Sequence, residues 1–365
     1  MRLPNDILVA LSIFLLLAPS FSEFSACSVD SEAHECRLWG ATADPVPTSV
    51  VRDYLVNMQY SLKNLGAYNR NGWALAHFNN TISTPVTRRG RLPANMDPAF
   101  DEAVNEIVDN DPQIVVGHVR IATSGLVDIP DPHPFNRSKN GKWWLFAHNG
   151  GVSKGITIEL MGNEYLNENL PQVGNGPDEW VDSELYFLYV LKCIEDQGWN
   201  VTLGVTQAVA TICEKNNYTL MNFLLTNGEH LWGFCKGYGL YYRYTPASET
   251  VSQWTVIASQ PPTSTYEGWA LLGDFDLLEA SRDKPPVVLD VRSIVIPEHP
   301  VSRLAGDVNN DGRVDLRDLF LMCKAFGSTP SRPNWDLKAD LVKPYNLVDT
   351  RDLIIVLQNF GQPKA

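Results

Sequence analysis

From residue 36 to about residue 289, short β-rich runs alternate in blocks with amphipathic helical stretches, and this pattern constrains the fold most strongly. Strands are predicted over residues 114–120, 143–148, 221–225, 231–234 and 254–258. Helices are predicted over residues 49–64, 98–108, 183–196 and 203–215. Because the strands cluster and the helices come in blocks, the pattern predicts an α+β fold and not a strict βαβ repeat.

After a proline-rich connection around residues 285–300 the composition changes abruptly, and an internal repeat follows. Val-Asp-Leu-Arg-Asp-Leu at 314–319 recurs as Val-Asp-Thr-Arg-Asp-Leu at 348–353, and Ala-Phe-Gly at 325–327 is echoed by Asn-Phe-Gly at 359–361. Such self-similarity indicates a duplicated motif. We therefore predict a large domain over residues 36–290, a linker over 291–303 and a small duplicated domain over 304–361.

Residues 1–22 have the features of a secretory signal peptide. Arg2 gives the positive start, residues 7–18 form an apolar run, and Ser20-Phe21-Ser22 offers a small-x-small cleavage site. Residues 23–35 are then a pro-segment, and the mature protein is predicted to be secreted or cell-surface, without a transmembrane domain. Two alternatives stay open: the apolar run is an uncleaved anchor, or Cys27 in a lipoprotein-like box carries a lipid.

Composition narrows the possible partners. The net charge of −13 argues against nucleic acid and anionic membrane surfaces, because both would be repelled. A content of 44% hydrophobic residues allows a packed core. Four glycosylation sequons agree with export and predict a glycoprotein, at Asn79, Asn136, Asn200 and Asn217. No CxxC pair is present, and three cysteines have the apolar surroundings of buried thiols: Cys193, Cys213 and Cys235.

Cys36 is the candidate nucleophile. If the peptide bond before it is cut, one residue carries both a thiol and a free α-amine. Model-peptide pKa values of about 7.7–8.0 for the amine and about 8.5 for the thiol suit proton transfer between them near neutral pH. The residue then supplies nucleophile and base together. Any residue left upstream makes the amine an amide, so this chemistry predicts a zymogen with a thiol nucleophile.

Five segments occur in the order typical of one enzyme family. They resemble the class II glutamine amidotransferases, and particularly the free-standing branch that begins Cys-Arg-x-x-Gly. The segments are Cys36-Arg37-Leu38-Trp39-Gly40, Gly72-Trp73-Ala74-Leu75-Ala76, Gly117-His-Val-Arg-Ile-Ala-Thr-Ser-Gly125, Ala147-His-Asn-Gly150 and Val181-Asp-Ser-Glu184, with Ser259-Gln260 near the end. The resemblance implies a four-layer αββα sandwich of the N-terminal-nucleophile (Ntn) hydrolase type. Ala74 and Val181 depart from the family's usual Gly and Thr.

The resemblance and the chemistry assign the same roles. Amide hydrolysis needs donors for a developing oxyanion, and the side chain of Asn149 with the N–H of Gly150, on a turn after a strand, would supply them. Arg120 would grip the α-carboxylate of a glutamine-like substrate with a bidentate fork. Asp182 would accept from the α-ammonium and cap a helix starting at Ser183. Two further substrate contacts are predicted, Thr123 and His118.

The predicted substrate is glutamine or a γ-glutamyl compound, cleaved through a γ-glutamyl thioester without a cofactor. Without a visible acceptor domain, we expect hydrolysis and not transfer. Residues 161–179 are predicted as a mobile loop that either covers the site or is a surface insertion. Two other functions stay open: an Ntn amidase for a different acyl amide, and a non-catalytic binding protein with an unprocessed leader.

The first repeat carries an EF-hand-like loop. Oxygen side chains stand at loop positions 1, 3, 5, 9 and 12, a glycine stands at the sharp turn, and a backbone carbonyl is available at position 7. This spacing suits Ca²⁺, although position 12 is Asp and not Glu. The predicted ligands are Asp307, Asn309, Asp311, the carbonyl of Arg313, Asp315 and Asp318. An acidic turn without metal is the alternative.

The second repeat is a poorer copy, because Val342 and Pro344 stand where donors are expected. Its candidate ligands form a degenerate site: Asp340, Asn346, Asp349 and Asp352. Two loop–helix repeats, with helices over 316–326 and 350–360, resemble a dockerin module. That resemblance implies a small all-α domain, structural Ca²⁺ and a cohesin-type protein partner.

Overall fold

The computed structural model describes residues 36–80, 83–122, 133–296, 305–309, 311–329, 332, 334–336, 338–342 and 347–361. The predicted signal peptide and pro-segment lie outside these residues. So do two of the candidate site residues, Thr123 and Asn346.

One antiparallel sheet holds seven strands in the order β11-β9-β10-β1-β4-β2-β3. Its central strand β1 (Arg37–Ala43) pairs with β4 (Pro112–Val119) on one side and β10 (Trp254–Ala258) on the other. The outer strands are β2 (Trp73–Asn79), β3 (Val86–Gly90), β9 (Tyr241–Thr245) and β11 (Ala270–Leu271). Cys36, which directly precedes β1, therefore lies at the end of the central strand of this sheet.

The second antiparallel sheet holds six strands in the order β13-β12-β8-β7-β6-β5. Strand β6 (Lys142–Val152) pairs with β5 (Phe135–Lys139) and with β7 (Tyr218–Thr226). The remaining strands are β8 (His230–Phe234), β12 (Asp276–Ser281) and β13 (Val287–Asp290), followed by a 3-10 turn over Val291–Ser293. All five strands predicted from the sequence are present, with bounds that agree to within a few residues.

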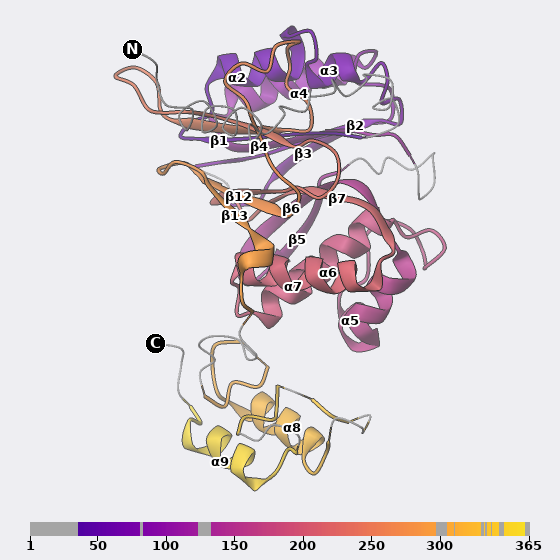
Figure 1. The fold of residues 1–365 in the computed structure, drawn as a ribbon, viewed down its shortest axis with the longest axis vertical. Coiled ribbons are helices and arrows are strands. Elements are labelled where there is room, and N and C mark those ends of the chain that lie inside the picture. The colour runs from indigo at the N-terminus through magenta and orange to yellow at the C-terminus, as the bar shows by residue number, and fades with distance from the viewer. Residues whose placement is uncertain are drawn as a thin grey trace, which may run out of the picture. The chain divides into compact units, whose positions relative to one another are not determined.

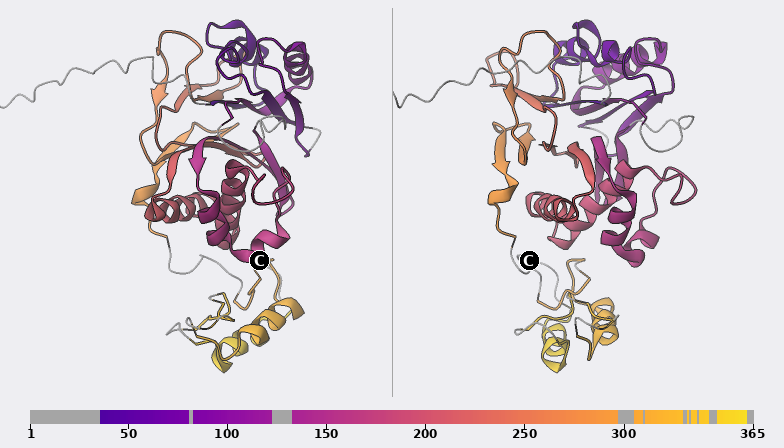
Figure 2. Two further views of the ribbon diagram at one scale, coloured as in Figure 1. Left: turned by 90° about the vertical axis from the view of Figure 1, so that its right-hand side faces the viewer. Right: turned by 45° about the vertical axis from the view of Figure 1, so that its right-hand side comes forward.

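Three apolar clusters separate four layers. One lies between the seven-stranded sheet and the helices of residues 48–109, a second between the two sheets, and a third between the six-stranded sheet and the helices of residues 154–215. Figure 1 and Figure 2 show the two sheets face to face with helices on both outer sides. The mixed fold with two antiparallel sheets that we expected is confirmed. Both inner sheet faces are apolar and helices cover the outer faces, so central strands such as β1 and β4 are buried on two sides.

The helices agree with the predictions in three places. Helix α4 (Pro98–Asp109) starts with proline at its first turn, while Asp97 accepts from the N–H of Ala99. Helices α6 (Asp182–Asp196) and α7 (Val201–Lys215) follow. Asn200 caps α7 by accepting from the N–H of Leu203 at 3.0 Å.

One helix prediction and one loop prediction were wrong. The expected helix over 49–64 is divided into α2 (Thr48–Arg52), a π-helical turn over Asp53–Asn57 and α3 (Leu62–Leu65), because Met58 is extended and Ser61 caps a new start. The expected loop over 161–179 is helical in its first part, since α5 runs over Lys154–Glu168. Gly162, at φ 74°, kinks α5 without ending it, and Leu166 packs into the core.

The C-terminal repeats, taken by themselves, form two helices on a small apolar core (Figure 1). Helix α8 (Leu316–Ala325) and helix α9 (Thr350–Gln358) begin with the same capping box. In each box the carboxylate of the first Asp accepts from the backbone N–H of the second, and the carboxylate of the second accepts from the backbone N–H of the first. The residues are Asp315 with Asp318 and Asp349 with Asp352. The sequence repeat is thus also a repeat of local structure. Among the described residues, no helix combines the length and the apolar character needed to cross a membrane.

Candidate active site

Cys36 lies directly before β1 and beside the end of β4. Its Sγ is 3.3 Å from the backbone nitrogen of Ile121, which donates to it, and 3.4 Å from the Ile121 carbonyl oxygen. The thiol is half-buried. The thiol donates to the Ile121 carbonyl and accepts from the Ile121 N–H, so the backbone of one residue holds the sulfur in place.

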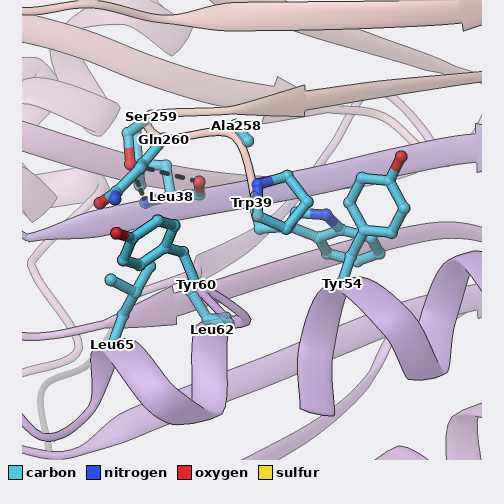
Figure 3. Close-up of a pocket in the computed structure, with 10 residues that line it drawn as sticks. Leu38, Trp39, Tyr54, Tyr60, Leu62, Leu65, Ala258, Ser259 and Gln260 are labelled. Atoms are coloured by element: carbon cyan, nitrogen blue, oxygen red, sulfur yellow. Dashed lines mark hydrogen bonds between the residues drawn. The ribbon is translucent and has the colours of Figure 1, made fainter. Parts of the chain in front are cut away.

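The segment after β10 fixes the strand that carries Cys36. Ser259 extends the β1–β10 ladder, because its N–H donates to the Leu38 carbonyl and its hydroxyl accepts from the Leu38 N–H, both at 3.0 Å. Figure 3 shows Ser259 and Gln260 against Leu38 at a small aromatic-walled hollow. Gln260 accepts from Arg37 Nε at 3.1 Å. None of the predicted catalytic residues lines this hollow.

Strand alternation directs three of the predicted residues toward the space between the sheets. Side chains in a strand point alternately to opposite faces, and the core between the sheets includes Leu38, Val116 and Ala147. Cys36, Arg120 and Asn149 each stand an even number of residues from one of these positions. They come from two different sheets and, by this alternation, face one another.

Arg120 is held by its backbone where β4 ends. Its N–H donates to the Gly72 carbonyl at 3.0 Å, and its own carbonyl accepts from the Asn71 N–H at 2.9 Å. The residue is only 3% exposed. These contacts explain why the segment around Gly72 belongs to the site: it positions Arg120.

Asn149 and Gly150 lie inside β6 and not on a turn after it, so this part of the prediction was wrong. Asn149 pairs with Asn222 and Gly150 with Met221, and the register shifts between Gly150 and Val152. The Asn149 side-chain oxygen is buried without a hydrogen-bond partner among the described residues. An Asn-Gly pair commonly makes a turn, but here the glycine lies inside a strand, at the point where the register of the β6–β7 ladder shifts.

Gly150 has a φ of 138°, and a Cβ there would lie 2.1 Å from the Leu220 carbonyl oxygen. Gly150→Ala is therefore expected to destabilise the protein by about 2–4 kcal/mol through strain and overlap. Gly151→Ala is the matched control. Its Cβ would lie 3.2 Å from Thr219 Oγ1 at an ordinary φ, so a loss below about 1 kcal/mol is expected. Urea unfolding measures both, and equal losses would contradict the argument.

Asp182 opens α6, one residue earlier than predicted, and does not cap it. The helix has no side-chain cap, and Asp182 Oδ2 instead accepts from the Val152 N–H at 3.3 Å. The next residue, Ser183, has its hydroxyl 2.8 Å from His148 Nδ1. The start of α6 is thereby joined to the strand segment that carries Asn149.

Glu184 holds the connection that precedes α6. Its buried carboxylate accepts from the N–H groups of Gln172 at 2.7 Å and Val173 at 3.1 Å, and it pairs with Arg137 at 3.1 Å. Burial raises the pKa of Glu184 despite these contacts. The last residue of the Val-Asp-Ser-Glu segment is thus structural: it ties residues 172 and 173 to the helix.

Two buried histidines join the sheets, and the sequence reasoning overlooked one of them. His118, a predicted substrate contact, is fully buried on β4, with its ring centroid 4.3 Å from that of His133. Burial, followed by the charge of Arg120, lowers the pKa of His118 to about 3. His133 was not predicted. Its only sequence signal is its place directly before Pro134 and β5.

A small pocket brings the site together. Most of the residues that line it come from β6, from the start of α6 and from the ends of β1 and β4. They are Cys36, Arg120, Ile121, His133, His148, Gly150, Val181, Asp182 and Ser183. Asn149 is adjacent in the strand but does not line the pocket, and His118 lies behind His133. A thiol, a guanidinium and a carboxylate therefore share one small hollow.

The sequence profile of the glutamine amidotransferases class-II matches residues 36–252, more than half of the chain. The chain belongs to this family. The match begins at Cys36 and includes every residue of the pocket.

Individual relatives are distant. An uncharacterized protein of Methanocaldococcus jannaschii is 27% identical over 184 residues, which are 49% of this chain and 47% of that protein. YafJ of Escherichia coli, provisionally named a glutamine amidotransferase, is 26% identical over 209 residues, 55% of this chain and 72% of that one. A glutamine aminotransferase class-II domain protein from Silicibacter pomeroyi superposes with a TM-score of 0.47 at 18% identity, over 70% of this chain and 99% of that structure. The chain spans about half the length of the archaeal relative.

Proposed function

We propose that the protein is an exported amidohydrolase that cleaves the side-chain amide of glutamine or a γ-glutamyl compound. The nucleophile is Cys36, freed as the N-terminal residue by removal of residues 1–35. The observation that carries this proposal is the shared pocket of Cys36, Arg120 and Asp182. It combines a nucleophile with a cation and an anion suited to the α-carboxylate and α-ammonium of a glutamyl group.

Acylation would begin when the Cys36 α-amine takes the thiol proton and the sulfur attacks the amide carbon. The carbonyl oxygen gains negative charge and is stabilised by the Asn149 side-chain N–H and the Gly150 backbone N–H. The C–N bond then breaks. The departing nitrogen takes the proton from the α-ammonium, which leaves a γ-glutamyl thioester on Cys36 and a free amine or ammonia.

Deacylation would reverse the proton path. The α-amine accepts a proton from water, the hydroxyl oxygen attacks the thioester carbon, and the same donors hold the oxyanion. The C–S bond breaks, and the sulfur recovers the proton from the α-ammonium. The products are free glutamate and the thiol of Cys36, so no cofactor and no redox step is required.

The pocket favours a glutamyl head over a plain acyl amide. A simple acyl amide or a lactam has neither an α-carboxylate nor an α-ammonium, and it would leave Arg120 and Asp182 facing a substrate without complementary charge. Buried polar groups that lose their partners oppose binding. We therefore rank the Ntn amidase for another acyl amide below the glutamyl enzyme, and the non-catalytic binding protein below both.

A substrate panel tests the proposal. Protein beginning at Cys36 is incubated with glutamine, a γ-glutamyl dipeptide, a γ-glutamyl thiol conjugate and an acyl amide without the amino-acid head. Release of glutamate is followed, and intact-protein mass spectrometry after acid quenching detects the thioester. We expect turnover of at least one glutamyl substrate and none of the acyl amide. Turnover of the acyl amide alone would overturn the glutamyl assignment.

We further propose that the first C-terminal loop binds structural Ca²⁺ in a dockerin-like module that attaches the enzyme to a cohesin-type partner. The oxygen donors suit Ca²⁺, and Asp307 is buried, which raises its pKa. Its carboxylate accepts from the N–H groups of Asp311 and Gly312. Within the described ranges, no three acidic, His or Cys side chains lie close enough to hold a metal, so binding would exchange some of these contacts for the cation.

Calcium addition to the metal-free full chain is expected to raise the unfolding temperature of the C-terminal module. A ligand at a hundred times its Kd stabilises by about 2.7 kcal/mol. Asp307→Asn should remove most of the effect, whereas Asp349→Asn in the degenerate copy should leave most of it. Differential scanning calorimetry with calcium or magnesium measures the shift. No shift at millimolar calcium would contradict the calcium assignment and leave the hydrolase proposal untouched.

A further inference from the structure

Strand β5 stops short of the active-site end of β6. The ladder between them pairs Phe135 with Phe146, and the same register continued would bring residue 133 opposite His148. Pro134 has no N–H to donate, and β5 starts only at Phe135. The backbone polar groups of His148 would lack a strand partner on that side.

The side chain of His133 takes the place of the absent strand. Its Nδ1 lies 2.8 Å from the His148 carbonyl oxygen and 3.1 Å from the His148 backbone nitrogen. If Nδ1 carries the proton it donates to the carbonyl, and if Nδ1 is bare it accepts from the N–H. The neutral ring is therefore bonded to the backbone of His148 in either tautomer.

His133 is itself held from the facing sheet. The His118 ring packs against it, tilted by 33°, with the two ring centroids 4.3 Å apart. His118 is fixed on both sides, since β4 pairs at this residue with Leu38 of β1 and Ala74 of β2. Burial lowers the pKa of both histidines, that of His133 well below its usual range, so two neutral rings connect the sheets.

We propose that His133 is a positioning residue for the amide hydrolysis, because it fixes the backbone of His148, and with it Asn149 and Gly150, relative to Cys36 on the other sheet. This inference rests on the proposed function. Cys36 belongs to the seven-stranded sheet and the oxyanion donors to the six-stranded sheet. The separation of nucleophile and donors thus depends on a contact between sheets at this end of the pocket, and the packed ring pair of His118 and His133 provides one.

The experiment compares three substitutions that keep different parts of the imidazole. His133→Asn keeps a polar atom near the Nδ1 position, His133→Gln keeps one near Nε2, and His133→Leu keeps only apolar bulk. With the best glutamyl substrate of the panel, we expect His133→Asn to retain kcat within about tenfold. His133→Gln and His133→Leu should lose about 10²-fold in kcat, the effect of a small misplacement of reacting groups. KM should stay within about threefold for all three, because Arg120 and Asp182 are untouched.

The outcomes separate this inference from the proposed function. A parent protein inactive on every glutamyl substrate overturns the function and the inference with it. An active parent with equal kcat losses for Asn and Gln would mean that kcat does not depend on the bond at Nδ1, and it would overturn positioning. Equal, undiminished kcat in all variants would overturn it as well. Two variants test the ring contact of His118 with His133. We expect His118→Phe, which keeps a flat ring, to retain kcat and His118→Ala to lose it. Equal kcat in these two variants would overturn the role of the ring contact. Thermal unfolding of each variant identifies loss of the fold.

Discussion

Replacing Cys36 with alanine should abolish amide hydrolysis, with a fall in kcat of about 10⁵-fold or more. Removing the nucleophile of a covalent hydrolase costs on the order of 10⁶ in kcat, because the remaining donors stabilise an oxyanion that no longer forms at a useful rate. Cys36→Ser is a sharper variant, since it keeps the shape but lacks a readily ionised thiol. The rate of glutamate release measures both.

Cys323→Ala is the matched control for the loss of a thiol. Cys323 is a free thiol that is exposed on α8 and far in sequence from the pocket residues. Its substitution should leave kcat unchanged within about twofold. Hydrolysis that survives in Cys36→Ala would contradict the assignment of the nucleophile, and the same loss in both variants would point to damage of the fold.

Replacing Arg120 with alanine should raise KM for a glutamyl substrate by about 30-fold to several thousand-fold. Truncating one partner of a buried charge pair costs about 2–5 kcal/mol, and Arg120 is 3% exposed in the pocket. The KM of Arg120→Lys should lie between those of the parent protein and Arg120→Ala, because lysine keeps the charge without the bidentate fork. Arg88→Ala, at a surface pair with Glu106, should leave KM unchanged.

A substrate that lacks the α-carboxylate identifies what Arg120 binds. 4-Aminobutanamide is glutamine without that carboxylate, and the parent enzyme should use it with a KM raised to a similar degree. In Arg120→Ala the two substrates should differ little, because the group that distinguishes them is gone. The cycle isolates the pairwise interaction. An unchanged KM in Arg120→Ala, or discrimination that persists without Arg120, would contradict the assigned role.

The α+β class and most elements could be predicted from the sequence because they depend on local periodicity, whereas the four layers were expected only from the family resemblance. The run over 254–258 became β10 with the same bounds, and the prediction for 98–108 became α4 with one added residue at its end. These segments have one strong pattern each, and their burial follows from it. The order of the strands within each sheet could not be predicted in this way, because pairing between distant segments leaves no local signal.

The errors concern positions where tertiary contacts override local preference. Asn149-Gly150 has turn chemistry, yet the β6–β7 ladder holds it in a strand and uses the glycine at φ 138°. Asp182 has the chemistry of a helix cap, yet its carboxylate accepts from Val152 on another element. His133 carried no motif of its own, since its importance comes from the place where β5 ends. Each case depends on a residue distant in sequence.

The central claim is that Cys36 becomes N-terminal, and peptide mass spectrometry of the N-terminus of the exported protein tests it most directly. We predict a chain that begins at Cys36 and carries a free α-amine, with glutamyl hydrolysis present only in that species. A fully active chain that still carries Glu35 or any earlier residue would contradict the account, because its Cys36 nitrogen would be an amide and could not act as the base.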